Sequence, residues 1–132
     1  MDEIKRNNLL SEYANVEAPI IPIRRFFDGN DDEGSIGCNL TEHPGIERFK
    51  QILEGLLSRS DVTAVYARIA ELDTGGYWPF TDTIAVTGSI SVDDLRAALT
   101  ELQPDEVGAA ADFGFVEAEL PDLAGTLAAW WD

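Results

Sequence analysis

The feature that most constrains the fold is an apolar stripe between residues 43 and 59. Its members recur at steps of three and four residues, the spacing that gathers side chains on one face of an α-helix. Pro44 fits the first helical position, where a missing N–H costs nothing. A helix with one apolar face must bury it against another layer, so the rest of the chain has to supply that layer. The stripe consists of Ile46, Phe49, Ile52, Leu53, Leu56 and Leu57.

Two strands and a second helix are predicted further along the chain. Residues 62–72 and 82–89 are rich in β-branched side chains, which favours strands, and residues 73–76 form a turn between them. The second helix should begin at Ser91, because Ser91 and Asp94 have the spacing of a capping box. Its buried stripe would be Val92, Leu95, Leu99 and Leu102, and Gln103 and Pro104 would end it.

The segments around these elements are less regular. Residues 19–27 are typical of an extended segment, and Pro22 restricts it to an edge strand because proline cannot donate to a ladder. Residues 28–35 have the composition of a loop. Residues 125–132 are predicted to form a closing strand, in which Trp130 and Trp131 face opposite sides. Residues 1–17 are expected to be flexible or peripheral.

Together the elements predict one α+β domain over residues 1–132. Two helices would pack on one face of a mostly antiparallel sheet and bury both stripes. The order strand, helix, strand, strand, helix, strand is that of the split βαβ, or ferredoxin-like, sandwich. That order alone does not fix which strands are neighbours.

The charge balance excludes several classes of partner. The chain has 25 acidic and 9 basic residues, a net charge of −16. Proteins that bind nucleic acid draw affinity from Lys and Arg side chains that neutralise phosphates, and proteins that dock on anionic lipid need a basic surface. We therefore expect neither nucleic acid nor a membrane as partner.

The acidic residues are unevenly distributed. Residues 97–132 contain 8 acids and no base. A continuous negative field steers a positively charged protein, although the same residues could form only a solvated surface. We expect a basic protein partner, with its association accelerated by Asp105, Glu106, Asp112, Glu117, Glu119 and Asp122.

The sequence also indicates a compartment. Cys38 is the only cysteine, so the chain cannot form an internal disulfide, and we expect Cys38 to be a buried small hydrophobe. The first eight residues are polar and lack the apolar core of a signal peptide. No stretch approaches the ~20 apolar residues that a membrane span needs. These features favour a cytoplasmic protein.

No motif for catalysis, cofactor binding or metal binding stands out. The acidic run from Asp28 to Glu33 fails the EF-hand register, because its sixth position is Glu33 and its twelfth is Asn39. The glycines match neither a dinucleotide-binding nor a phosphate-binding loop. We predict no catalytic, cofactor or metal residues. The alternative is a small metal- or ligand-binding enzyme domain in which Asp28, Asp31, Asp32 and His43 converge on one cleft.

Candidate binding residues come from two loops and from the acidic C-terminal third. Tyr77 and Trp78 lie between the two predicted strands, where they could close one end of the core or anchor a protein interface. A non-catalytic binding module would combine such anchors with the acidic loops. The partner-binding candidates are Asp28, Asp31, Asp32, Glu33, Tyr77, Trp78, Asp105 and Glu106.

Several short stretches together resemble a family of small bacterial proteins, the immunity proteins of polymorphic-toxin and contact-dependent inhibition systems. The resemblance implies a cytosolic, non-catalytic protein that binds one cognate toxin domain and neutralises it. It supplies no catalytic residues. The stretches are FFDGNDDEGSIGCNL at 26–40, HPG at 43–45, WPFTDT at 78–83, LQPDEVG at 102–108 and WWD at 130–132.

Overall fold

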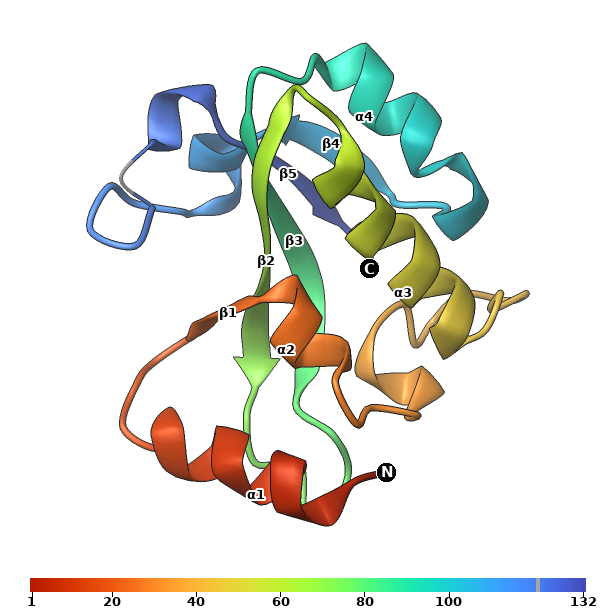
Figure 1. Ribbon diagram of the computed structural model, residues 1–132, viewed down its shortest axis with the longest axis vertical. Coiled ribbons are helices and arrows are strands. Elements are labelled where there is room, and N and C mark those ends of the chain that lie inside the picture. The colour runs from red at the N-terminus through yellow and green to blue at the C-terminus, as the bar shows by residue number, and fades with distance from the viewer. Residues whose placement is uncertain (121) are drawn as a thin grey trace.

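A five-stranded antiparallel sheet organises the chain (Figure 1), as a computed structural model that describes residues 1–120 and 122–132 shows. The strands lie in the order β1-β2-β3-β5-β4, and each neighbouring pair is antiparallel. The fold is therefore α+β, as the sequence predicted. The strand bounds are β1 (Ile20–Pro22), β2 (Val62–Glu71), β3 (Phe80–Gly88), β4 (Glu106–Ala109) and β5 (Leu127–Trp130).

The sheet is not a split βαβ. In that arrangement the strand before the first helix lies inside the sheet, whereas β1 is an edge strand that pairs only with β2. Pro22 ends β1 after three residues, which confirms the predicted edge position. β5 pairs with β3 on one side and with β4 on the other, so β4 is the edge strand at the far side of the sheet from β1.

Within residues 1–120 and 122–132 the α-helices are α1 (Glu3–Glu12), α2 (Ile23–Phe27), α3 (Ile46–Gly55) and α4 (Val92–Ala98), and short 3-10 helices accompany them. Residues 23–27 were predicted to be extended, and this is wrong. Ile23, Phe26 and Phe27 are all buried, and their three- and four-residue spacing brings them to one side of a single helical turn. Helix α1 falls within the N-terminal segment that was expected to be flexible or peripheral, and Leu9 is its buried residue.

The main predicted helix is present but shorter. It begins at Ile46, after Gly45, whose φ of 99° lies in the region that favours glycine, so Pro44 precedes the helix instead of opening it. A 3-10 turn over Leu56–Ser58 follows it. The stripe itself is confirmed, because Phe49 and Leu53 are fully buried.

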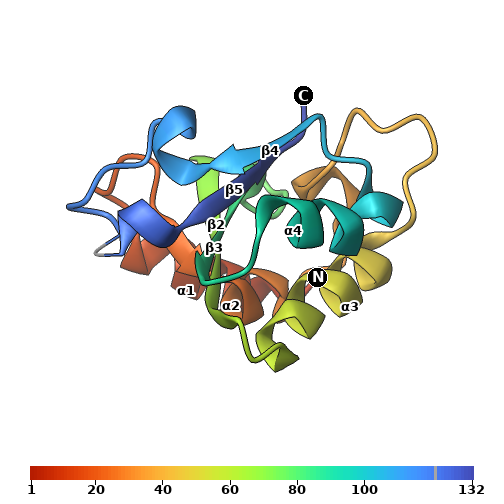
Figure 2. The same ribbon diagram turned by 90° about the horizontal axis from the view of Figure 1, so that it is seen from above.

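Helices α2, α3 and α4 lie along one face of the sheet, and residues 110–120 and 122–125 cover the other (Figure 2). The helical face holds the larger core, which includes Trp131. On the opposite face, Phe115 and Leu120 pack with Ala85 and Ala128 of the central strands. Both faces of β3 are therefore buried. Across the described ranges, 1–120 and 122–132, no helix is long and apolar enough to cross a membrane.

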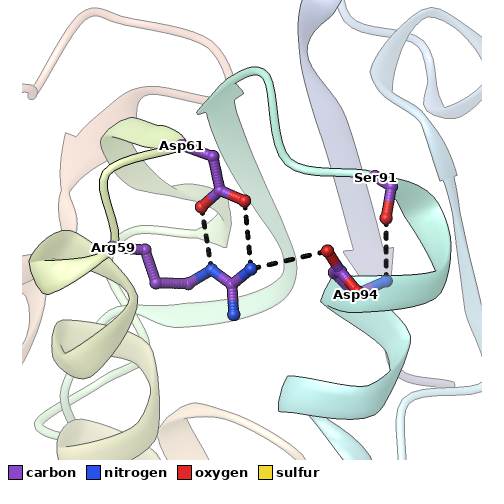
Figure 3. Close-up of polar contacts among 4 residues, drawn as sticks. All are labelled: Arg59, Asp61, Ser91 and Asp94. Atoms are coloured by element: carbon purple, nitrogen blue, oxygen red, sulfur yellow. Dashed lines mark hydrogen bonds and ion pairs between the residues drawn. The ribbon is translucent and has the colours of Figure 1, made fainter.

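Helix α4 begins as the sequence predicted. The Ser91 hydroxyl accepts a hydrogen bond from the Asp94 N–H at 3.1 Å (Figure 3), and Leu95, Leu99 and Leu102 are buried. We expect Ser91→Ala to lower the free energy of unfolding by about 1 kcal/mol, because the helix loses its N-cap. Urea denaturation measures this, and Ser91→Asn, which keeps a capping side chain, is the control. Equal stability of the wild type and Ser91→Ala would show that the cap contributes nothing.

Candidate functional site

Most of the predicted binding residues lie at one end of the sheet. Because neighbouring strands are antiparallel, β2 and β5 end where β3 and β4 begin. Figure 1 shows the β2–β3 connection beside α1 at this end. Two contacts bring residues 28–36 to the same place: Ile36 bridges Thr81, and the Trp78 N–H donates to Asp32. We call this region the acidic end; its carboxylates are Asp28, Asp31, Asp32, Glu33, Glu71, Asp73, Asp82, Asp105, Glu106 and Asp132.

Asp32 joins two loops that are far apart in the sequence. Its Oδ1 accepts the Gly34 N–H at 2.9 Å, and its Oδ2 accepts the Trp78 N–H at 3.2 Å. The Asn30 side chain is buried and holds the same loop by accepting the Asp32 N–H and donating to Ser35. Residues 28–35 are therefore a well-anchored turn, and Asp32 positions the β2–β3 connection.

Asp28 and Asp31 attach the N-terminal helix to the acidic end. The Lys5 ammonium lies 2.6 Å from an Asp28 carboxylate oxygen, and this hydrogen bond raises the pKa of Lys5 above its usual value. The N-terminal amine lies 2.9 Å from Asp31. Gly29 has a φ of 83°, and a Cβ there would lie 2.8 Å from Asp2, so only glycine allows this close approach.

The two aromatic candidates differ in exposure. Trp78 is 1% exposed and belongs to the main core, so its ring closes the end of the core and is not an exposed interface anchor. Tyr77 is 67% exposed, and its backbone carbonyl accepts hydrogen bonds from Arg6 and Thr74. Among the described residues, the Trp78 indole N–H has no hydrogen-bond acceptor. Of these two rings, Tyr77 is therefore the one that a partner can reach.

A cavity of about 370 Å³ lies where the two loops meet. Two acidic and three aromatic residues are among those that line it, and none of the described lining residues is basic. The structure thus brings three of the predicted binding residues to one hollow. The lining residues are Asp32, Gly34, Glu71, Thr74, Tyr77, Trp78 and Phe80.

Asp105 and Glu106 lie further across the same end. Three strand spacings of ~4.8 Å separate β2 from β4, so Glu106 at the start of β4 is roughly 14 Å from Arg68 in the same row, and Glu71 at the end of β2 is further away. Asp105 accepts the Asp132 N–H at 2.6 Å. Glu106 is exposed and lines a second cavity, of about 310 Å³, with Arg68 and Trp130. These two acids extend the acidic end without joining the first cavity.

Arg68 is a cation of this region that the sequence analysis did not single out. Arg68, Thr83, Trp130 and Glu106 are consecutive partners across four strands, which places them in one row on the face opposite the helices. The Arg68 guanidinium lies 4.1 Å from the centre of the Phe115 ring. This packing fixes Arg68 under Phe115, and only that tertiary arrangement reveals it.

The alternative site around His43 is not assembled. The His43 Nδ1 accepts the Gly45 N–H, so its Nε2 carries the hydrogen and donates to the Ile36 carbonyl at 2.9 Å. Asp28, Asp31 and Asp32 each make the separate contacts described above. In the part of the chain that the structure describes, no three His, Cys, Asp or Glu residues are grouped as a metal site.

Cys38 is exposed, and the expectation that it is buried is wrong. Gly37 occupies the inward position instead, where an added Cβ would lie 2.7 Å from the Phe49 ring. The chain turns at this glycine, whose φ is 65°, and the following side chain faces solvent.

Calcium should leave the melting temperature nearly unchanged. The loop 28–35 lacks the bidentate Glu of a calcium loop, so millimolar calcium should stabilise the protein no more than sodium chloride of equal ionic strength. Thermal unfolding followed by circular dichroism makes the comparison. A rise of many degrees with calcium alone would mean that these carboxylates form a metal site.

Opposite the acidic end, one ion-pair cluster fastens the helical layer to the sheet. Two guanidinium nitrogens of Arg59 lie 2.9 and 3.0 Å from the Asp61 carboxylate oxygens, and one lies 3.6 Å from Asp94 of α4 (Figure 3). The hydrogen bonds from Arg59 lower the pKa of Asp61 below its usual value. The Asp61 carbonyl also accepts the N–H groups of Ser89 and Ile90. These contacts are structural and lie away from the acidic end.

The fold and the site define a small acidic α+β protein with a sheet covered on both faces and a carboxylate-rich end. The chain belongs to the family described as "Uncharacterized protein YfbO family", whose model matches residues 2–129. It is similar to "Uncharacterized protein YfbO" of Escherichia coli (strain K12), with 26% identity over 117 residues that cover 86% of this chain and 83% of that protein. No solved structure matches the chain. Neither description mentions a toxin, so immunity remains a hypothesis.

Proposed function

We propose that this protein is a non-catalytic binding module that recognises a positively charged protein through its acidic end. The observation that carries the proposal is the concentration of carboxylates where β2, β3, β4 and β5 meet. Lys5 and the N-terminal amine pair with Asp28 and Asp31, while Glu71 and Glu106 are exposed and form no ion pair with any described residue. Such a surface attracts a basic partner over distances comparable with the Debye length.

The rigidity of this surface also supports a binding role. Asp32 ties the loop 28–35 to the β2–β3 connection, and Arg6 of α1 donates to the Tyr77 carbonyl at 2.8 Å. A surface held in place before the partner arrives loses little conformational entropy when it binds. Exposed carboxylates then supply association rate and specificity, and Tyr77 supplies contact area.

We further propose that the partner is a bacterial toxin domain, which the protein neutralises as immunity proteins do. This rests on the sequence resemblance described above and on charge, since toxins that act on nucleic acid need a basic surface to contact phosphates. When the toxin binds the acidic end, the basic surface with which it contacts phosphates would be covered. The mechanism needs no catalytic residue in this chain. It needs a complex that dissociates slowly enough to keep the toxin from its target.

The test is affinity capture from the native host with two charge-matched variants. Glu71→Lys/Glu106→Lys changes two exposed acids of the acidic end, and Glu47→Lys/Asp93→Lys changes two exposed acids on α3 and α4. We expect the wild type and the second variant to retain one basic protein that the first variant loses. Expression of that protein alone should arrest growth, and coexpression of the wild-type chain should restore it. Equal capture by both variants would contradict binding at the acidic end, and a captured partner that does not affect growth would contradict the immunity role.

A further inference from the structure

The helix α1 lies against the acidic end and places positive charge there. Figure 1 shows it beside the β2–β3 connection, and its contacts reach both loops of that end. The Lys5 ammonium pairs with Asp28 at 2.6 Å, and the Arg6 guanidinium donates to the Tyr77 carbonyl at 2.8 Å. These are the two basic side chains of residues 1–17. The chain therefore applies a cationic segment of its own to this surface.

We propose that α1 is an autoinhibitory helix, which a positively charged partner displaces from the acidic end when it binds. This inference rests on the proposed function and adds its regulation. While α1 is in place, Asp28 is neutralised and the Tyr77 carbonyl is occupied, so the partner competes with a tethered segment. The apparent affinity of the acidic end is then its intrinsic affinity multiplied by the fraction of molecules in which α1 is released. Asp32 still joins the two loops after release, because its contacts do not involve α1.

Apart from these polar contacts, α1 is held weakly. Leu9 is the buried residue among the ten that form the helix. A cavity of about 240 Å³ lies between α1 and α2, so the two helices do not pack closely there; its lining residues are Lys5, Asn8, Leu9, Arg25 and Asp28. Ion pairs between exposed side chains contribute little to stability and are screened by salt. A segment with so few buried apolar contacts opens at a low free-energy cost.

The sequence of α1 gives the released helix little stability of its own. Asn7 and Asn8 occupy its centre, and asparagine is a poor helix former. Isolated helices shorter than ~12–15 residues are marginal in water. Released α1 is therefore largely unfolded, and the conformational entropy that it gains favours release.

The far end of α1 is anchored separately. Arg25 pairs with Glu12 and lies over the ring of Tyr13, which packs against the main core. The contacts with the acidic end come from Lys5 and Arg6, near the other end of the helix. Release therefore moves α1 about its C-terminal end and leaves the strands in place.

Hydrogen exchange and chemical shifts of the α1 amides measure its release directly. A hexalysine peptide, as the cationic probe, is added to the ¹⁵N-labelled chain at low salt. At saturation we expect the amides of residues 5–12 to exchange at least about threefold faster and to shift towards their unfolded values, whereas the amides of α3 stay protected. Raising sodium chloride from about 0.01 to about 1 M without peptide should also speed exchange in α1, because it screens the ion pairs. Amides of α1 that remain protected and unshifted at saturation would overturn the proposal.

Removing the cationic contacts of α1 should strengthen peptide binding. Lys5→Gln/Arg6→Gln does this, and Arg48→Gln/Lys50→Gln is the control, because it removes the same charge from α3 and also frees one carboxylate from an ion pair. The first variant should bind hexalysine about threefold more tightly than the control, since it loses the competitor as well as the charge. Equal affinities would mean that α1 does not compete.

Asn7→Ala/Asn8→Ala tests the competition without changing any charge. Alanine favours the helix, so attached α1 gains stability over the released and unfolded segment. Hexalysine should then bind about threefold more weakly than to the wild type, whereas Gln51→Ala, at an exposed position of α3, should leave its affinity unchanged. Wild-type affinity in the asparagine variant would contradict the autoinhibitory role.

These outcomes are separate from those that test the proposed function. If α1 stays in place while Glu71→Lys/Glu106→Lys still loses the captured protein, the acidic end is the binding surface and autoinhibition falls. If hexalysine releases α1 but the capture experiment retains no basic protein, the proposed function fails instead.

Discussion

Leu53→Ala should lower the free energy of unfolding by about 2–5 kcal/mol. Leu53 lies on the inward face of α3, is 0% exposed and packs in the core between this helix and the sheet. Truncation removes apolar contact and leaves a cavity that the neighbouring side chains fill only in part. This is one of the two largest effects that the fold predicts for a small change in the chain.

Urea unfolding of the wild type and Leu53→Ala measures the difference. Leu57→Ala is the matched control, because Leu57 follows α3 but is only partly buried, and its loss should cost clearly less. A cost below about 1 kcal/mol for Leu53→Ala would mean that α3 presents a different face to the sheet.

The central elements could be predicted because their signals are local. The stripe of α3 repeats over three turns, and the Ser91 cap is completed three residues away at Asp94. The strands β2 and β3 are long and rich in β-branched residues, and the structure confirms both. Each of these patterns is complete within about a dozen residues, so the sequence carries it without help from distant contacts.

Three parts of the fold were not predicted: β4, the segment that covers the second face of the sheet, and α2. β4 has four residues, of which Val107 alone is β-branched, and it exists through its pairing with β5. The sequence after β4 has no periodicity, because residues 110–120 and 122–125 cover the sheet with separate side chains such as Phe115 and Leu120. Helix α2 was hidden because one helical turn after Pro22 is too short to show a pattern.

The candidate site was predicted in composition but not in geometry. The sequence indicated the acidic loop and the Tyr77-Trp78 pair, yet the hydrogen bond that joins them spans 46 residues. The burial of Trp78 and the exposure of Tyr77 are also decided by packing, since adjacent aromatic residues look alike in a sequence. Glu71 and Arg68 were not singled out, because an acid or a base within a strand carries no sign of which cavity it lines.

The second large effect concerns association. Glu71→Lys/Glu106→Lys should slow association with the captured basic protein by roughly tenfold or more at low salt, because electrostatic steering raises association rates by about 10–10³. Glu47→Lys/Asp93→Lys changes the net charge by the same amount, but at exposed residues of α3 and α4 that are not among the carboxylates of the acidic end. It should therefore slow association much less.

The central claim is tested most directly by stopped-flow measurements of how fast the wild type and the two double variants associate with the captured protein. They should be compared at about 0.01 M ionic strength, where the Debye length is ~30 Å, and at about 1 M, where it is ~3 Å. If the partner binds at the acidic end, the association rates of the two variants should differ greatly at low salt and hardly at all at high salt. Equal rates for both variants at low salt would contradict it, because the negative charge would then act only as a whole-molecule field and the partner would bind elsewhere.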